Sequence, residues 1–303
     1  MLMTTATVHL TPRTPGCELV GPPGTPITVV LGGISAHRHV GGPRGWWPDL
    51  VGPGCVLDPT RCRILGIDWV VPETGTITTA DQADRLAALL DQLAIDRVQA
   101  VVGASYGGMV ALAFAARHPE RVGRLAVISA AHEPHPMATA HRVIQRRIVR
   151  LGLAAGTPRD GVALARALAL TTYRTAEEFA TRFEVTPATH RGRQQFPVER
   201  YLDHGSQRFA ASWSAERYLA LSESIDLHAV DPADITVPLA LLGVAEDRLV
   251  PRWQLQALHR RTRGPCTLEE ISSPTGHDAF LTEPAQVAAF LSRVLPAEVC
   301  RAA

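Results

Sequence analysis

The chain has 303 residues, a formal net charge of +1 at pH 7 and a hydrophobic share of 46%. This size fits one large α/β domain with an insertion, or two small domains. The near-neutral charge gives no electrostatic basis for binding nucleic acid or an anionic membrane surface, so we expect neither partner. No apolar run is long enough to span a bilayer, and we therefore expect no transmembrane helix.

The N-terminal segment and the cysteines indicate the cellular setting. Residues 1–20 lack a basic region followed by an apolar core, so we do not expect a secretory signal. The five cysteines are odd in number and form no CxxC pair, which favours a reduced, cytoplasmic setting without a zinc site or another bound metal. Cys55 and Cys62 are interpreted as small, buried apolar residues.

Strand-like and helix-like segments alternate along the first part of the chain. Such β-α-β alternation predicts a mostly parallel sheet with helices on both faces. The predicted strands are 27–33, 63–68, 98–102 and 124–130, with a helix over 81–95 and another that runs from Tyr106 to about His118.

The alternation stops near His132 and resumes only after Leu227. The sequence between them is arginine-rich, has helical character and shows little strand signal, whereas 237–251 and 266–273 again contain strand-like runs before a final helix at 283–295. We therefore predict an α/β core of residues 1–131 and 228–303, interrupted by a helical lid at 132–227. The lid should lie over the C-terminal ends of the strands.

The pentapeptide Gly103-Ala-Ser105-Tyr-Gly107 joins a predicted buried strand to a predicted helix. A tight turn with serine as a helix N-cap would explain it structurally. The strand–turn–helix setting is also the context of a G-x-S-x-G nucleophile elbow, which presents a serine hydroxyl at the end of a sheet. We favour the elbow, with Ser105 as the nucleophile.

A serine nucleophile needs a base, and the base needs an acid that orients it. In the α/β-hydrolase architecture these follow in the chain order Ser, Asp or Glu, His. Asp247 follows one predicted strand and His277 follows the next, with Glu246 as a competing acid. Weaker candidates for the base, which precede the acid in the chain, are His37, His39 and His132.

Acyl transfer also needs hydrogen-bond donors for the oxyanion that develops on the carbonyl. The main-chain N–H of Tyr106, at the start of the helix after Ser105, is one predicted donor. The loop after the first strand, LGGISAHRHV, is expected to supply the other, and we choose the N–H of Ile34. The structural alternative is a glycine-rich turn without a catalytic role.

Several long segments resemble the homoserine O-acyltransferase family, whose members are α/β-hydrolase-fold enzymes that acylate the side-chain hydroxyl of homoserine. The resemblance extends from about residue 27 to the end of the chain and is much more specific than G-x-S-x-G alone. The segments that carry it are GWWPDLVGPGCVLDP (45–59), GASYGGMVAL (103–112), RALALTTYRTAEEFATRF (166–183), VERYLDHGSQRFAASWSAERYLALSESID (198–226), EDRLVP (246–251) and GHDAFL (276–281).

The resemblance implies roles for individual residues. Ser105, Asp247 and His277 correspond to the catalytic triad of the family. Ile34 and Tyr106 lie where the family has its oxyanion-hole backbone donors.

The resemblance also implies how the substrates bind. Arg166 corresponds to the lid arginine that binds the amino-acid carboxylate, and Tyr173 to its neighbouring tyrosine, while Asp278 lies where the family binds the substrate amino group. A guanidinium for the carboxylate and a carboxylate for the ammonium suit a zwitterion. The family implies L-homoserine and acyl-CoA as substrates, a ping-pong acyl-serine mechanism, no bound cofactor and a homodimer formed through the lid helices.

Two segments depart from the common pattern of the family. Ile34-Ser35 stand where common members carry Leu-Thr, and the segment after Asp68 is WVVPETGTITTA where common members have a longer glycine- and serine-rich stretch. Resemblance to a shorter branch leads us to expect succinyl rather than acetyl transfer. Arg38 and Arg44, near the predicted oxyanion loop, are candidates for binding a succinyl carboxylate.

Other activities fit the same residues. The alternatives are homoserine O-acetyltransferase, serine O-acyltransferase, and an esterase or peptidase of the same fold. A non-catalytic small-molecule receptor is disfavoured by the intact serine, aspartate and histidine.

Overall fold

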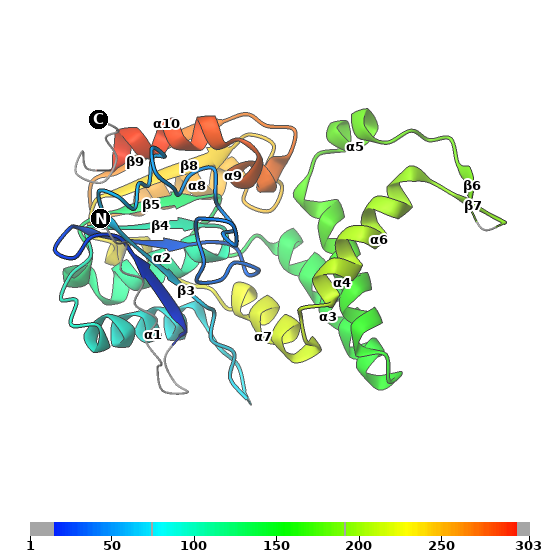
Figure 1. Ribbon diagram of the computed structural model, residues 1–303, viewed down its shortest axis with the longest axis horizontal. Coiled ribbons are helices and arrows are strands. Elements are labelled where there is room, and N and C mark those ends of the chain that lie inside the picture. Colours follow the sequence, from blue (N-terminus) through cyan, green and yellow to red (C-terminus); the bar gives the residue numbers. More distant parts are fainter. Residues whose placement is uncertain (1–14, 74, 191, 296–303) are drawn as a thin grey trace.

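The structure is a computed structural model that describes residues 15–73, 75–190 and 192–295. Its centre is a seven-stranded sheet with the strand order β1-β3-β2-β4-β5-β8-β9 (Figure 1). Strand β1 is antiparallel to β3, and all other neighbours are parallel, as predicted. The strands are β1 (Cys17–Val20), β2 (Ile27–Leu31), β3 (Arg63–Ile67), β4 (Ala100–Ala104), β5 (Leu125–Ile128), β8 (Leu239–Val244) and β9 (Cys266–Ile271).

Two details of the sheet differ from the sequence-based expectation. The short edge strand β1 was not predicted, because four residues of alternating burial leave too weak a pattern. Strand β4 was predicted at 98–102 but lies at Ala100–Ala104. All five of its residues are buried. With this shift the strand ends at Ala104, so no loop residue separates it from Ser105.

Helices cover both faces of the sheet (Figure 1). On one face, Leu86 of α1 and Leu112 of α2 are fully buried in one apolar cluster. On the other, Phe290 of α10 packs in a second cluster with Trp47. Because both faces are covered, strands β4, β5 and β8 contain only apolar residues and glycine. The elements around the sheet are α1 (Thr79–Gln92), α2 (Tyr106–Arg117), η1 (Pro119–Arg121), η2 (Pro232–Asp234), α8 (Arg252–Arg261), η3 (Gly276–Asp278), α9 (Ala279–Thr282) and α10 (Pro284–Val294).

The chain between β5 and β8 forms a group of helices, most of which lie to one side of the sheet (Figure 1). Helices α3 and α4 cross closely at two glycines that face each other. A Cβ on Gly152 would lie 2.7 Å from Gly161 Cα, so the crossing needs glycine there. A small hairpin, β6–β7, was not predicted in this region. The elements are α3 (Pro136–Ala154), α4 (Pro158–Tyr173), α5 (Ala176–Arg182), β6 (Ala188–His190), β7 (Arg193–Gln195), α6 (Pro197–Ala210) and α7 (Ala215–Asp226).

The helical group has an apolar cluster of its own, which includes Val149, Val162 and Phe209. The division at residues 132 and 227 stays a prediction. The outer limits of the predicted core, residues 1 and 303, lie outside the described residues, as does Cys300.

Within the described ranges, no helix is long and apolar enough to cross a membrane. The four cysteines described there form no disulfide, and they are Cys17, Cys55, Cys62 and Cys266. Burial raises the pKa of Cys62 to about 11, so this thiol is a neutral group of the core, whereas Cys55 is only partly buried.

Candidate active site

Ser105 occupies a strained turn between β4 and α2. Its backbone has φ 53° and ψ −120°, a conformation that costs about 1–3 kcal/mol in a non-glycine residue. The glycines on either side allow the turn to pack closely. A Cβ on Gly103 would lie 2.5 Å from the carbonyl oxygen of Gly107, and a Cβ on Gly107 would lie 2.3 Å from the carbonyl oxygen of Leu31. The G-A-S-Y-G stretch therefore forms the elbow geometry that its sequence predicts.

The structure brings the three predicted triad residues into one hydrogen-bonded row. Ser105 Oγ lies 2.8 Å from His277 Nε2, and His277 Nδ1 lies 2.7 Å from Asp247 Oδ2. The other carboxylate oxygen of Asp247 accepts the backbone N–H groups of Leu249 at 2.8 Å and Val250 at 3.0 Å. Because the Asp247 carboxylate must accept, Nδ1 carries the proton and Nε2 is free to accept the serine proton.

Glu246, the competing acid, is engaged elsewhere. Its carboxylate accepts the Ser272 hydroxyl at 2.6 Å and the Ser273 backbone N–H at 2.9 Å. The three weaker histidine candidates are absent from the described lining of the cavity at Ser105, and they are His37, His39 and His132. The geometry therefore favours Asp247 and His277.

The environment of His277 shifts the pKa of its imidazole. Burial by itself lowers the pKa of His277, but the charge and hydrogen bond of Asp247 raise it, and the pKa lies above its ordinary value. A buried imidazole held by a carboxylate suits proton transfer near neutral pH.

A cavity of about 120 Å³ opens beside Ser105. Ile34 and Tyr106, the predicted oxyanion-hole residues, both line it. In the described part of the chain, neither of their backbone N–H groups donates to another protein atom. The side chain of Tyr106 points elsewhere, because its hydroxyl lies 2.7 Å from Ser224 Oγ. This contact holds the first turn of α2 in place. Two N–H groups are thus left for a ligand at the predicted positions.

Arg166 and Tyr173 come to the same cavity from α4, where their spacing of seven residues places them on one helix face. Arg166 Nη1 lies 3.3 Å from the Tyr173 hydroxyl, and the guanidinium stacks over the Phe209 ring at 4.7 Å. The Tyr173 ring lies 6.1 Å from the imidazole of His277. Tyr173 therefore contacts Arg166 on one side and lies near His277 of the hydrogen-bonded row on the other.

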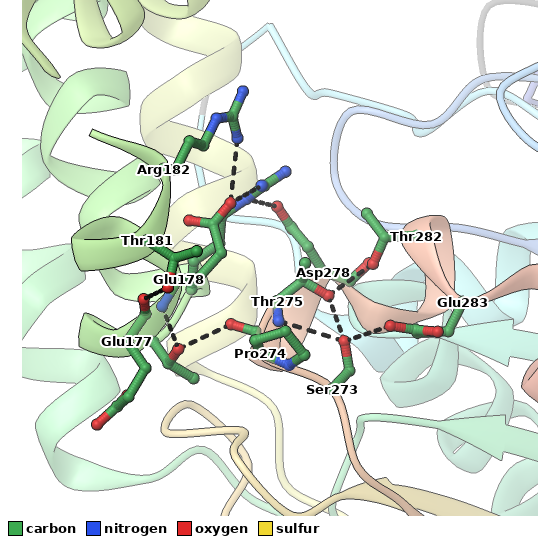
Figure 2. Close-up of polar contacts among 12 residues, drawn as sticks. Glu177, Glu178, Thr181, Arg182, Ser273, Pro274, Thr275, Asp278, Thr282 and Glu283 are labelled. Carbon is green, nitrogen blue, oxygen red and sulfur yellow. Dashed lines mark hydrogen bonds and ion pairs between the residues drawn. The ribbon is translucent and has the colours of Figure 1, made fainter. Parts of the chain in front are cut away.

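Asp278 also lines the cavity, but it is not free. Its Oδ2 lies 3.4 Å from Nε of Arg174, whose Nη1 donates to Glu178 at 2.7 Å. Figure 2 shows Asp278 and Glu178 on either side of this link between the core and the helical group. The Thr175 hydroxyl adds a hydrogen bond of 2.9 Å to the carbonyl oxygen of Pro274. Among the described residues, this long contact to Arg174 is the only side-chain contact that an ammonium group would displace from the Asp278 carboxylate.

Known proteins share this arrangement of fold and sequence. The family model of the alpha/beta hydrolase fold matches residues 36–284. The chain is 44% identical over 286 residues to a homoserine O-succinyltransferase of Xanthomonas campestris pv. campestris. The match covers 92% of this chain and 78% of that protein. The chain belongs to the homoserine O-acyltransferase family. The α/β-hydrolase fold and the family that the sequence predicted are therefore confirmed.

More distant relatives support the same family. This acyltransferase is 33% identical over 296 residues to a homoserine O-acetyltransferase of Thermus thermophilus, across 87% of the chain and 75% of that protein. An esterase structure superposes with a TM-score of 0.81 at 19% identity, covering 91% of this chain and 93% of the esterase. That likeness shows the fold alone.

Sequence reasoning missed the contribution of α3 to the cavity of this acyltransferase. Ala138, His141, Arg142 and Gln145 line it at helical spacing. The spacing was visible in the sequence, but polar residues on a helix usually face water. Arg38 and Arg44, the candidates for a succinyl carboxylate, are absent from the described lining, and Arg38 Nη1 instead forms a 2.9 Å ion pair with Asp68.

Among the described residues, no group of three or more histidine, cysteine, aspartate or glutamate side chains is arranged to hold a metal ion.

Proposed function

We propose that the protein transfers a succinyl group from succinyl-CoA to the side-chain hydroxyl of L-homoserine, a reaction that serves methionine biosynthesis in the cytoplasm. The observation that carries the proposal is the row Ser105–His277–Asp247, which opens into a cavity whose wall contains Arg166 and Tyr173. A nucleophile beside a guanidinium suits an amino-acid acceptor. The succinyl donor is favoured by the relative of 44% identity over the acetyltransferase relative of 33% identity.

In the first half-reaction, Ser105 Oγ attacks the thioester carbonyl while its proton moves to His277 Nε2, 2.8 Å away. The N–H groups of Ile34 and Tyr106 stabilise the oxyanion. The carbon–sulfur bond breaks, the proton on His277 passes to the departing CoA thiolate, and an acyl ester remains on Ser105. Asp247 holds the imidazole in the required tautomer and stabilises its protonated form.

In the second half-reaction, the homoserine hydroxyl attacks the acyl ester. His277 takes the hydroxyl proton, a new ester bond forms on homoserine, and the proton returns to Ser105 as its ester bond breaks. Arg166 binds the substrate carboxylate, supported by Tyr173, and Asp278 binds the ammonium in place of Arg174. These contacts place the acceptor where water would otherwise hydrolyse the acyl-enzyme.

A hydrolase on the same fold is the second candidate, because the same triad serves ester hydrolysis. The esterase likeness does not favour it, since that likeness reflects the fold alone. Arg166 of α4 and Asp278 of η3 bring opposite charges to the cavity and match a zwitterionic acceptor. An esterase for neutral esters has no use for them.

The proposed enzyme is a homodimer that associates through the helical group. Large apolar side chains are exposed there, with Leu151 of α3 70% and Leu164 of α4 62% accessible. We take these exposed leucines as part of the dimer contact. Sedimentation of wild type and Leu151→Asp tests the proposal: a dimer that the substitution dissociates supports it, and a monomeric wild type contradicts it.

A matrix of two donors and two acceptors tests the proposed reaction. Succinyl-CoA and acetyl-CoA are each combined with homoserine and with serine, and CoA thiol release and the O-acyl product are measured. We expect succinyl-CoA with homoserine to give the highest kcat/KM. Thiol release that no amino acid accelerates would identify a hydrolase instead.

A further inference from the structure

A second arginine lines the cavity beside Ser105, and the proposed reaction has not used it. Arg142 reaches the cavity from α3, the helix that packs against α4. Its Nε donates to Asp226 Oδ1 at 2.7 Å, and its Nη2 lies 3.4 Å from Thr139 Oγ1. Its Nη1 has no partner among the described residues. One edge of the guanidinium therefore remains available to a ligand.

The charges around Arg142 do not balance. The single carboxylate of Asp226 serves two guanidinium groups, because Arg146 Nη1 donates to its Oδ2 at 2.6 Å. The same Nη1 of Arg146 also donates to the carbonyl oxygen of Ser222 at 3.0 Å and to its hydroxyl oxygen at 3.1 Å. The side chains of Arg142, Arg146 and Asp226 are only 13%, 9% and 9% exposed. A buried surplus of one positive charge is costly, and an anion in the cavity would offset it.

We propose that Arg142 determines donor specificity by binding the distal carboxylate of a dicarboxylic acyl group while the thioester carbon of that group lies at Ser105. This inference rests on the proposed function and names the part of the site that recognises succinyl. A guanidinium edge suits a carboxylate because the two form charge-assisted, paired hydrogen bonds. An acetyl group has no carboxylate, and it would leave the Arg142 charge unpaired.

The number of cations in the cavity agrees with this assignment. When homoserine meets a succinyl-enzyme, two carboxylates are present, one on the acyl group and one on the amino acid. The cavity wall offers two arginines, Arg142 from α3 and Arg166 from α4. Arg166 lies beside Tyr173 with its guanidinium stacked on aromatic rings, whereas Arg142 is held by a carboxylate.

The Arg142 charge also acts on the catalytic base. Burial and Arg142 both lower the pKa of His277, against the raising effect of Asp247. An acyl carboxylate paired with Arg142 would neutralise that effect, and His277 would then be a stronger base with a succinyl than with an acetyl donor. Arg142 forms and breaks no covalent bond in this role. Its substitution should change the choice of donor rather than abolish acyl transfer.

The test compares Arg142→Gln with Arg147→Gln, a matched loss of one charge at an exposed position of the same helix. The readout is kcat/KM for succinyl-CoA and for acetyl-CoA at saturating homoserine. Arg142→Gln should lower the succinyl value by at least about 30-fold, as expected when one partner of a desolvated charge pair is removed. The acetyl value should not fall, because an acetyl group has no carboxylate for Arg142 to bind, and Arg147→Gln should change neither value.

Arg142 also supports the fold through Asp226, so its role must be separated from stability. Arg142→Lys retains the charge without the paired geometry and should keep part of the preference for succinyl-CoA. Thermal unfolding of both variants shows whether they are folded. An equal fall for the two donors, or an unchanged donor ratio in a folded variant, would overturn the assignment of Arg142.

A mass measurement without acceptor distinguishes failure of this inference from failure of the proposed function. Wild type is mixed with each acyl-CoA, and the acyl-enzyme is quantified. Fast succinylation that depends on Arg142 but is not followed by transfer to homoserine would support Arg142 and contradict the acceptor. Equal acylation by both donors, insensitive to Arg142→Gln, with normal transfer to homoserine would contradict Arg142 alone. A wild type that prefers acetyl-CoA would overturn both the donor and the role of Arg142.

Discussion

The carboxylate of Asp247 lies 2.7 Å from Nδ1 of His277, while its neighbour Glu246 is bound to Ser272 and Ser273, which follow β9. Of these two adjacent carboxylates, Asp247 therefore holds the imidazole of His277 and Glu246 does not. The backbone N–H groups that the Asp247 carboxylate accepts from Leu249 and Val250 fix this choice.

Asp247→Asn should lower kcat by up to about 10⁴-fold, because the amide can no longer hold the imidazole in its working tautomer. Glu246→Gln is the matched control on the adjacent residue and should retain activity close to that of wild type. Steady-state kinetics with homoserine and succinyl-CoA give both values. An active Asp247→Asn enzyme beside an inactive Glu246→Gln enzyme would reverse the assignment of the acid.

The pH dependence follows from the raised pKa of His277. The base must be neutral, so kcat/KM for the acyl-CoA should rise with pH through an apparent pKa above the usual value of about 6.5. Asp247→Asn should move this pKa down, because the carboxylate is what raises it. A profile that is flat from pH 5 to 8 would show that His277 is not the base.

The raised pKa of His277 also affects the stability of the fold. This contribution to stability decreases with rising pH, whereas the activity increases. A histidine whose pKa is raised in the folded state stabilises the fold fully below its unfolded pKa of about 6.5. That contribution is lost as the pH rises through the folded pKa. The His277–Asp247 pair therefore stabilises the inactive, protonated enzyme most.

Arg166→Leu should spare acylation of Ser105 and damage transfer to homoserine. Loss of one partner of a desolvated charge pair costs roughly 2–5 kcal/mol, or about 30-fold to several thousand-fold in kcat/KM for homoserine. The exposed Arg159 of the same helix provides the control Arg159→Leu. Single-turnover acylation and acceptor kinetics separate the two steps, and an unchanged dependence on homoserine would exclude Arg166 from the acceptor site.

The burial of His228 predicts that the fold loses stability in acid. Its Nε2–H donates to the carbonyl oxygen of Ala131 at 3.0 Å, and its Nδ1 accepts the Thr79 hydroxyl at 2.7 Å, so the ring is neutral. Burial lowers its pKa to about 3. The unfolded chain therefore binds a proton first, and the free energy of unfolding should decrease as the pH falls below about 6.5 towards 3.

Urea unfolding at several pH values measures this effect. His228→Gln should be less stable than wild type at pH 7 but should lose less stability on acidification, whereas His204→Gln, at an exposed position of α6, should follow wild type. Equal pH slopes for wild type and His228→Gln would show that His228 does not cause the acid sensitivity.

The sequence predicted the parts of the site that depend on local pattern. The strand before Ser105, the glycines around it and the order of Asp247 and His277 all follow from short-range constraints that the residues themselves carry. The cavity wall from α3 did not follow in this way. Arg142 reaches the site only because α3 packs against α4 and α7, and nothing in the residues near Arg142 indicates that tertiary contact.

The surroundings of Arg38 and Asp278 show the same limit of sequence reasoning. Arg38 is close to the oxyanion loop in sequence, yet its backbone N–H and guanidinium are both bound by Asp68. Proximity along the chain therefore suggested a cation that is absent from the described lining of the cavity. The partner of Asp278 was equally hidden, since Arg174 lies 104 residues away in the sequence.

The most direct test of the central claim is intact-mass analysis of the enzyme mixed with succinyl-CoA and then with homoserine. Wild type should gain the mass of one succinyl group on Ser105, and homoserine should remove it with formation of O-succinylhomoserine. Ser105→Ala should remain unmodified and should lose on the order of a million-fold in rate. An adduct that persists in Ser105→Ala, or a variant that keeps a substantial fraction of wild-type transfer, would contradict the acyl-Ser105 mechanism.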